Sequence, residues 1–306
     1  MLQTAGVSGS AEVQSSRSLA RAVVSTARPQ QWVKNVLVVA AAAAAGALGH
    51  DDVPGRVAAA CLAFCLLASG IYAINDVRDV AEDRLHPRKR FRPVAAGDLA
   101  PWAAITVGAA AIAAGLTACL LFSPLLALVA LGYVTLTLSY TLVWRHLVAF
   151  DIVAVAGGFV LRAIAGGVSA NVPLSGWFIA VVTLSAVLVA TGKRRAELLR
   201  TQHGQTPRRR VLAHYTETAL QTIVLLSVIG VLIAYTLWAF EARVGAGVPW
   251  RVLTILPFTA AIVRYVMLVR RGDGEAPEEM LFGDRPLQLA SVVWLALFVL
   301  EVNAAA

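Results

Sequence analysis

Long apolar segments alternate with shorter polar ones through most of the chain. A helix that crosses a membrane needs about 20 mainly apolar residues. Nine segments approach that length: 32–49, 55–75, 101–122, 124–144, 149–167, 174–192, 217–240, 250–270 and 286–304. None of the nine has the alternating pattern of a membrane β-barrel strand. We therefore expect an all-α integral membrane protein, a bundle of about nine transmembrane helices.

The composition excludes an ordinary water-soluble protein. Of the 306 residues, 58% are apolar and 14% are charged, whereas soluble domains have roughly 45–50% and about 25%. We expect residues 1–16 to form a disordered N-terminal tail and residues 17–306 to form a single membrane-embedded domain. Residues 17–31 mix arginines with aliphatic residues, which is typical of a short helix on the membrane surface.

The basic residues suggest an orientation in the membrane. The net charge of +8 comes from 26 Lys and Arg against 18 Asp and Glu, and the basic residues collect before the first apolar segment and in 76–100 and 193–216. Cytoplasmic loops are rich in Lys and Arg. We therefore expect a multi-pass protein of the inner (plasma) membrane with its N-terminus and active site facing the cytoplasm. No nucleic-acid partner is expected, because the basic segments lack interleaved aromatic residues.

An acidic motif follows the second apolar segment. If the helix continues, Asn75, Asp76, Asp79 and Asp83 fall within an arc of roughly 100°. Carboxylates on one face repel each other, and Mg²⁺ is a natural ion to place among them, since it binds carboxylates together with substrate phosphates. We expect these four residues to be metal ligands and the three aspartates to be catalytic. The alternative is a solvated helix end whose acids are paired with nearby arginines.

Two further groups could bind an anionic substrate through charge-assisted hydrogen bonds. They follow the acidic motif and the sixth apolar segment, and they consist of Arg88, Lys89, Arg90 and Arg92, and of Lys193, Arg194 and Glu197. Each group also has an ordinary explanation. The first can simply mark a cytoplasmic loop, and Lys193 and Glu197 have the spacing of an i,i+4 ion pair.

Ionisable residues also lie within the apolar segments. Asp151 and Arg162 share one segment, and an ionisable residue inside a membrane is by default a candidate for function. We include both, together with Tyr140 near the end of the preceding segment, as candidate substrate contacts. A structural role is an equal alternative for Asp151 and Arg162.

The motif N-D-x-x-D-x-x-x-D at 75–83 resembles the first aspartate-rich motif of the UbiA prenyltransferase family. These are intramembrane enzymes that use Mg²⁺ to bind a diphosphate. Further segments resemble the branch of this family that transfers phosphoribose to a polyprenyl phosphate. They are 28–35, 89–93, 161–167, 173–175, 192–197, 237–241 and 264–265.

This resemblance implies substrates and an activity. The donor would be phosphoribosyl pyrophosphate and the acceptor decaprenyl phosphate or another polyprenyl phosphate, held in the lipid bilayer. The product would be decaprenylphosphoryl-5-phosphoribose, a precursor of cell-wall arabinan in arabinogalactan. Lys34, Lys193 and Arg194 become candidates for the lipid phosphate or the ribose phosphate. A homo-oligomer is possible.

The chain departs from the family pattern at the second motif. Many members carry D-x-x-x-D after the sixth helix, whereas residues 192–197 here hold one carboxylate, Glu197, beside three cations. We therefore expect this segment to bind anionic groups directly.

Two alternatives stay open. A related enzyme of the same family could move a prenyl group from a prenyl diphosphate to an aromatic acceptor. A membrane transporter could use Asp151 and Arg162 for substrate movement, although transporter sites usually lie at the bilayer midplane and most charges here lie in loops.

Overall fold

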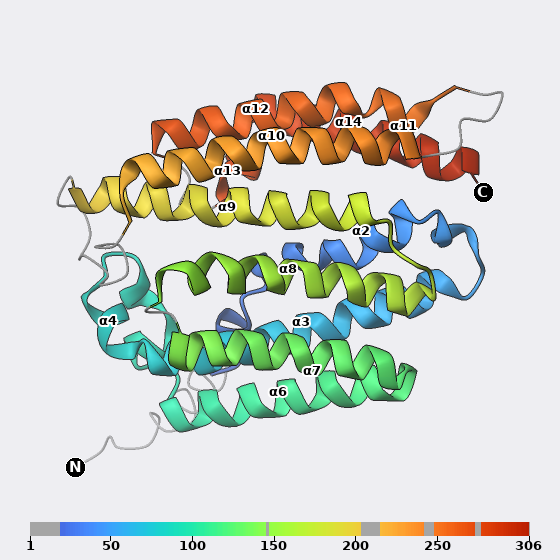
Figure 1. Ribbon diagram of the computed structural model, residues 1–306. Helices are drawn as coiled ribbons and strands as arrows, with labels where there is room; N and C mark the ends of the chain where they lie inside the picture. Colours follow the sequence, from blue (N-terminus) through green and yellow to red (C-terminus); the bar gives the residue numbers. More distant parts are fainter. Residues whose placement is uncertain (1–18, 145–146, 203–214, 242–247, 273–276, 306) are drawn as a thin grey trace, which may run out of the picture. The chain divides into compact units, whose positions relative to one another are not determined.

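The computed structural model describes residues 19–144, 147–202, 215–241, 248–272 and 277–305. Every regular element in these ranges is a helix (Figure 1), so the all-α prediction is confirmed. The elements, with η marking 3₁₀ turns and the π turn η4, are a helix at 19–27, η1 (Pro29–Asn35), α2 (Val36–Ala44), η2 (Ala47–Gly49), α3 (Val53–Arg78), α4 (Val80–Leu85), η3 (Lys89–Phe91), α5 (Pro93–Ala96), α6 (Pro101–Phe122), α7 (Pro124–Ser139), η4 (Tyr140–Trp144), α8 (Val148–Ala170), α9 (Gly176–Gln202), α10 (Glu217–Glu241), α11 (Trp250–Leu253), α12 (Ile255–Arg271), α13 (Pro277–Gly283) and α14 (Arg285–Ala305).

Eight helical stretches in the described ranges are long and apolar enough to cross a membrane, and they coincide with the last eight predicted segments. The first predicted segment, 32–49, differs because it is divided among η1, α2 and η2. The nine-residue α2 is about 14 Å long, less than half of a hydrocarbon core of about 30 Å. Gly46, with a left-handed φ of 70°, follows its end.

The predictions for the N-terminal region are tested only in part. A helix is present at 19–27, within the predicted range 17–31, and its position on a membrane surface stays a prediction. The tail predicted at 1–16 lies outside the described residues.

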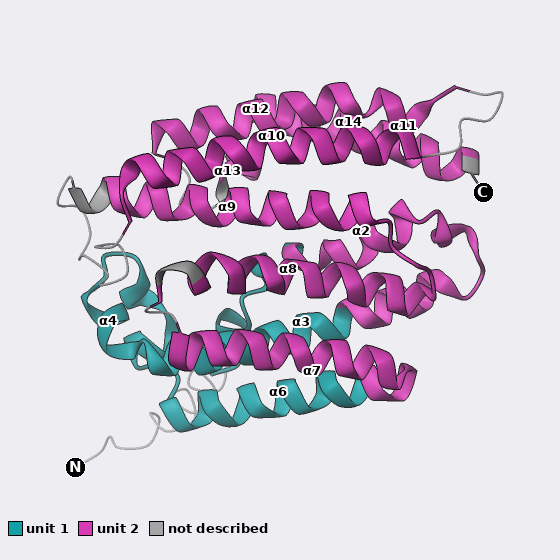
Figure 2. Ribbon diagram, viewed as in Figure 1, with its two compact units in different colours: residues 1–33, 62–118 teal, residues 34–61, 119–306 magenta. Residues whose placement is uncertain are grey.

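The chain divides into two compact units (Figure 2). The first comprises residues 1–33 and 62–118, and the second comprises 34–61 and 119–306. The division passes through α3 and α6, so each of these helices supplies residues to both units.

In the first unit, α3 and α6 approach closely at two glycines. A Cβ atom on Gly70 would lie 2.4 Å from the carbonyl oxygen of Gly108. Small residues allow this contact between membrane helices. The helix at 19–27 is held to α3 through Ser69, whose hydroxyl donates to the carbonyl of Ala27 at 3.0 Å and accepts the indole N–H of Trp32 at 3.0 Å. These contacts fix the chain on both sides of Arg28.

In the second unit, α8, α9 and α10 pack in sequence order, and α2 and α7 both pack on α8 (Figure 1). The contact between α2 and α8 is close, since a Cβ atom on Gly166 would lie 2.1 Å from the carbonyl oxygen of Val38. Aromatic residues fill the core where α9, α10 and α12 meet. Tyr235 of α10 stacks on Phe258 of α12 at 3.7 Å, and Trp238 of α10 packs against Phe178 of α9.

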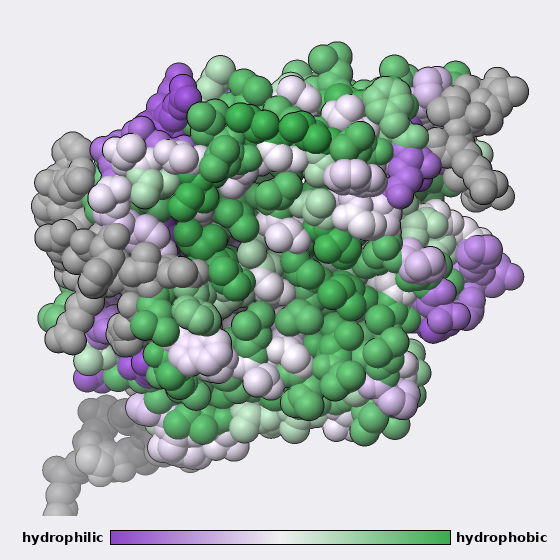
Figure 3. Space-filling view, viewed as in Figure 1, coloured by the Kyte–Doolittle hydropathy of each residue, from purple (hydrophilic) through white to green (hydrophobic). Residues whose placement is uncertain are grey.

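Hydrophobic residues cover most of the face drawn in Figure 3. Many large apolar side chains on the long helices are exposed, including Leu121 at 83% and Leu256 at 79%. Exposed apolar surface on this scale is unusual for a protein in water and is what lipid-facing helices require.

We expect Gly70→Val to destabilise the protein by at least about 1–3 kcal/mol, because the new side chain overlaps the backbone of α6. Thermal unfolding in detergent would measure the change. Gly55→Val is the matched control, since a Cβ there meets nothing within 4 Å and lies in the same helix. Equal unfolding temperatures for the two variants would contradict the close approach.

Candidate functional site

The aspartate motif lies in the first unit, where α3 passes into α4. Asp79 stands between the two helices with φ −91° and ψ 7°. The helical hydrogen bonds nevertheless continue, from the Asp79 N–H to the Asn75 carbonyl at 2.9 Å and from the Asp83 N–H to the Asp79 carbonyl at 2.8 Å. Asp76, Asp79 and Asp83 are buried, with exposed fractions of 1%, 8% and 3%. The acids therefore do not form a solvated helix end.

Two arginines pair with these acids. Nη1 of Arg92 donates to Oδ1 of Asp76 at 3.2 Å and to Oδ2 of Asp83 at 2.6 Å, so one nitrogen joins the two carboxylates. Nη2 of Arg28 also donates to Oδ1 of Asp76, and the Arg28 guanidinium lies over the Tyr72 ring at 5.0 Å. Buried carboxylates need such partners, because an unpaired charge in an apolar interior is very costly.

The carboxylate oxygens of the aspartate motif are of the chemical type that binds a divalent cation. Oδ2 of Asp76 is buried and has no hydrogen-bond partner among the described residues. Such an oxygen, with the neighbouring carboxylates, is the type of ligand that Mg²⁺ prefers. No group of three or more His, Cys, Asp or Glu side chains in the described ranges is gathered around one point. The ion pairs with Arg28 and Arg92 take up two of the oxygens concerned.

Of the four predicted basic residues after the motif, the structure brings Arg92 to the acids. Arg88 and Arg90 are exposed, and Arg90 lies over the ring of its neighbour Phe91 at 4.7 Å. Lys89 is half-buried, and its backbone N–H donates to Nδ1 of His86 at 3.3 Å. Contacts from Arg88, Lys89 and Arg90 to a substrate phosphate stay predictions.

The sequence interpretation missed Arg28. This residue ends the helix at 19–27 and takes a left-handed φ of 52°, which is uncommon for a residue with a side chain. The sequence pattern predicts only that the arginines of 17–31 are charges on a membrane-surface helix. The available signal was Pro29, which disfavours a helical conformation at the residue before it, but no local pattern pairs Arg28 with Asp76.

The second unit holds a separate charged cluster around Arg194. Its Nη2 donates to Oδ1 of Asp151 at 2.7 Å while Nε donates to the other oxygen, and Nη1 donates to Glu197 at 2.5 Å. Tyr140 donates its hydroxyl to the same Asp151 oxygen. Tyr140 begins the π turn η4 after α7, a distortion that often marks functional positions. The structure thus brings together four predicted residues from α8, α9 and η4.

Tyr215 borders this cluster. Burial raises the pKa of its hydroxyl to about 12, and the negative charge of Asp151 adds to the rise while Arg194 opposes it. The phenol therefore stays protonated at neutral pH and can donate a hydrogen bond. Of the other predicted residues in this unit, Lys193 is exposed and Lys34 is half-buried, so both are accessible to solvent.

Arg162 has a different environment. Its Nε donates to Oδ1 of Asn35 at 2.6 Å, Nη1 to the Gly158 carbonyl at 2.9 Å and Nη2 to the Tyr133 hydroxyl at 2.7 Å. The guanidinium also lies over the Tyr133 ring at 4.6 Å. These contacts join α7, α8 and the start of α2, which favours the structural alternative for Arg162. A substrate contact for this residue stays a prediction.

Arg195 is a second buried arginine that we had not singled out. Its Nη1 donates to the Val269 carbonyl at 3.0 Å and its Nη2 to Glu217 at 3.2 Å, so it joins α9 to α12 and α10. Sequence patterns alone do not distinguish this residue from its neighbour Arg194, because both are arginines at one helix end.

Comparisons with known proteins identify the chain as a membrane transferase. The chain belongs to the UbiA prenyltransferase family, whose model matches residues 35–292. A protein of Mycobacterium tuberculosis named decaprenyl-phosphate phosphoribosyltransferase is 41% identical over 283 residues, covering 91% of this chain and 93% of the relative. A protein of the same name from Corynebacterium glutamicum is 40% identical over 306 residues, covering 98% and 92%.

A solved structure shares the fold. It is that of a UbiA homologue from Archaeoglobus fulgidus bound to DMAPP and Mg²⁺, and it matches with a TM-score of 0.70 over 92% of this chain and 99% of that chain. The two sequences are 16% identical. The structural likeness therefore establishes the fold of this chain and leaves its substrate to other evidence.

We expect Asp151→Ala to lower the free energy of unfolding by about 3–5 kcal/mol, because it leaves Arg194 without its bidentate partner in a buried position. Glu197→Gln is the matched control, since Glu197 contacts the same guanidinium but its side chain is more exposed. Unfolding in detergent would measure both. A larger effect from Glu197→Gln than from Asp151→Ala would contradict this account.

Proposed function

We propose that this protein transfers 5-phosphoribose from phosphoribosyl pyrophosphate to decaprenyl phosphate or another polyprenyl phosphate and releases pyrophosphate. The observation that carries the proposal is the identity of 40–41% to two relatives named decaprenyl-phosphate phosphoribosyltransferase, over 91–98% of this chain. The buried aspartates and their arginines supply chemistry that suits a diphosphate donor.

The aspartate motif is proposed to bind the diphosphate of the donor. Asp76, Asp79 and Asp83, assisted by Asn75, would hold Mg²⁺, and this ion would offset the negative charge that develops on the departing pyrophosphate. Arg28 and Arg92 now neutralise Asp76 and Asp83. With Mg²⁺ held by the aspartates, the guanidinium groups of Arg28 and Arg92 would be available to hydrogen-bond the phosphate oxygens. Arg88, Lys89 and Arg90 would add positive charge around the same group.

The acceptor needs no general base. A lipid monophosphate is ionised at neutral pH, so one of its oxygens can attack the anomeric carbon directly. We assign its phosphate, or the 5-phosphate of the donor, to Lys34, Lys193 and Arg194. Asp151, Tyr140 and Glu197 would then position Arg194 through the hydrogen bonds described above.

The cellular setting is part of the same proposal. The protein would work as one transferase domain over residues 17–306 in the inner membrane, with its N-terminus and chemistry on the cytoplasmic side, where phosphoribosyl pyrophosphate is available. Its product, decaprenylphosphoryl-5-phosphoribose, would supply arabinan for the arabinogalactan of the cell wall. Assembly into a homo-oligomer is compatible with this role.

We expect Asp76→Asn and Asp83→Asn each to lower the rate of phosphoribosyl transfer by at least about a hundredfold, because each removes charge that holds the cation. The assay is transfer of labelled phosphoribose to decaprenyl phosphate in membranes, with Mg²⁺ and with a chelator. Asp98→Asn is the control, since Asp98 is exposed in the same unit. Normal turnover in both motif variants would refute the assignment.

The donor can be identified by ligand-induced stabilisation. With Mg²⁺ present, phosphoribosyl pyrophosphate should raise the unfolding temperature of the purified protein, by an amount equivalent to about 2.7 kcal/mol at a hundred times its dissociation constant. Dimethylallyl diphosphate at the same concentration should raise it far less. The reverse order would favour prenyl transfer, and stabilisation by neither would count against both enzymatic interpretations.

A further inference from the structure

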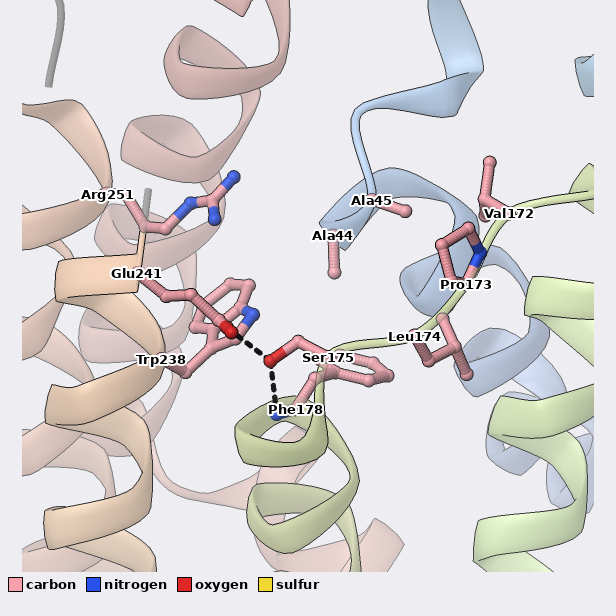
Figure 4. Close-up of a pocket in the computed structure, with 10 residues that line it drawn as sticks. All are labelled: Ala44, Ala45, Val172, Pro173, Leu174, Ser175, Phe178, Trp238, Glu241 and Arg251. Atoms are coloured by element: carbon pink, nitrogen blue, oxygen red, sulfur yellow. Dashed lines mark hydrogen bonds between the residues drawn. The ribbon is translucent and has the colours of Figure 1, made fainter. Parts of the chain in front are cut away.

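A cavity of about 270 Å³ lies in the second unit, away from the Arg194 cluster (Figure 4). Its wall includes Ser175 and Phe178 at the start of α9, Trp238 and Glu241 at the end of α10, and Arg251 in α11. Arg194 stands 16 residues after Phe178 along α9, which is about 24 Å in an α-helix. The two sites therefore occupy opposite ends of the same membrane-spanning helix.

One side of this cavity offers a fixed guanidinium, which is ion-paired with Glu301 on the edge formed by Nε and Nη2. Nε and Nη2 of Arg251 both contact Glu301, at 2.9 Å, and the guanidinium lies over the Trp238 ring at 4.9 Å. These contacts hold the plane of the guanidinium in place. Nη1 has no hydrogen-bond partner among the described residues, and Arg251 lines the cavity, so it can donate to an anionic group there.

The other side offers the carboxylate of Glu241, which a hydrogen bond from Ser175 holds in place. The Ser175 hydroxyl donates to Oε2 of Glu241 (Figure 4), and its oxygen accepts the backbone N–H of Trp177 at 3.2 Å. The backbone N–H group thus fixes the direction of the hydroxyl proton. In the described part of the chain Oε1 of Glu241 accepts no hydrogen bond, so it can receive one from a cation.

Much of the remaining lining is apolar. It includes Leu174, Phe178 and the two alanines Ala44 and Ala45. Next to the lining positions, Trp177 and Phe240 are exposed at 43% and 61%. Both α9 and α10 are candidate membrane spans, so these exposed rings lie near the end of an apolar, lipid-facing surface.

We propose that this cavity binds the headgroup of a zwitterionic aminophospholipid. Its phosphate would accept hydrogen bonds from Arg251, and its primary ammonium would donate to Glu241. A purely anionic headgroup would meet the repulsion of Glu241, and a quaternary ammonium could not donate a hydrogen bond to it. Trp177 and Phe240, which are exposed and adjacent in sequence to lining residues, would contact the acyl chains, and this favours an intact lipid over free phosphoethanolamine.

The test is native mass spectrometry of the purified full chain after delipidation, with added phosphatidylethanolamine, phosphatidylcholine or phosphatidylglycerol of one acyl composition. We expect phosphatidylethanolamine to be retained best and soluble phosphoethanolamine to compete weakly. Glu241→Gln should lower its retention by about tenfold or more, since it removes a charged hydrogen bond. Asp52→Asn, which removes an exposed acid that pairs within its own helix end, should leave retention unchanged.

Two further variants test the individual contacts of the headgroup. Ser175→Ala keeps the charge of Glu241 but removes the hydroxyl that orients it, so retention should fall by less than in Glu241→Gln. Arg251→Gln should reduce the retention of all three lipids, because it removes the contact to their common phosphate. Equal retention of the three lipids by the unaltered protein, or undiminished phosphatidylethanolamine retention in Glu241→Gln, would overturn the proposal.

Discussion

A carboxylate buried between apolar helices must be matched by a positive charge, and this requirement organises the polar interior of both units. In the first unit Asp76 and Asp83 are matched by Arg28 and Arg92. In the second unit Asp151 is matched by Arg194. The desolvation cost of these groups is high in an apolar interior. Each pairing therefore joins the elements that carry it.

The same requirement links the structure to the proposed chemistry. The two carboxylate oxygens of Asp76 differ in their contacts. Oδ1 accepts hydrogen bonds from both Arg28 and Arg92, while Oδ2 has no partner in the described residues. In this arrangement Asp76 and Asp83 are each paired with an arginine without a metal ion. Binding of a cation together with a diphosphate would bring charges of both signs to the site, so that a carboxylate and an arginine could each exchange one partner of opposite charge for another.

The spans could be predicted from the sequence because burial in lipid requires long apolar runs, and eight of the nine segments appear as membrane-length helices. The exception, 32–49, is apolar enough but is broken into short elements, since Gly46 and the turns around it interrupt the helix. Hydropathy measures composition within a window, and it does not report such local changes of backbone conformation.

Candidate residues could be named from the sequence on several elements, but which of them lie together could be predicted only for residues close in sequence. The proximity of Asp76, Asp79 and Asp83 could be predicted, because their spacing alone places them on successive helical turns. Arg28 pairs with Asp76 across 48 residues, and Arg162 pairs with Asn35 across 127. Contacts at such separations depend on how helices pack. For Arg162 these contacts favour a structural role, which composition alone could not distinguish from substrate binding.

The backbone at Arg28 has one further consequence. A left-handed conformation costs a residue other than glycine roughly 1–2 kcal/mol, and here it is maintained by the contacts of Ser69 with Ala27 and Trp32 on either side. The backbone that carries this side chain is therefore fixed by the folded chain before any ligand arrives, and Asp76 and the Tyr72 ring hold the guanidinium. An anion that binds to it meets a donor whose conformational entropy has already been lost, so the affinity gained per hydrogen bond is larger than a flexible surface arginine could provide.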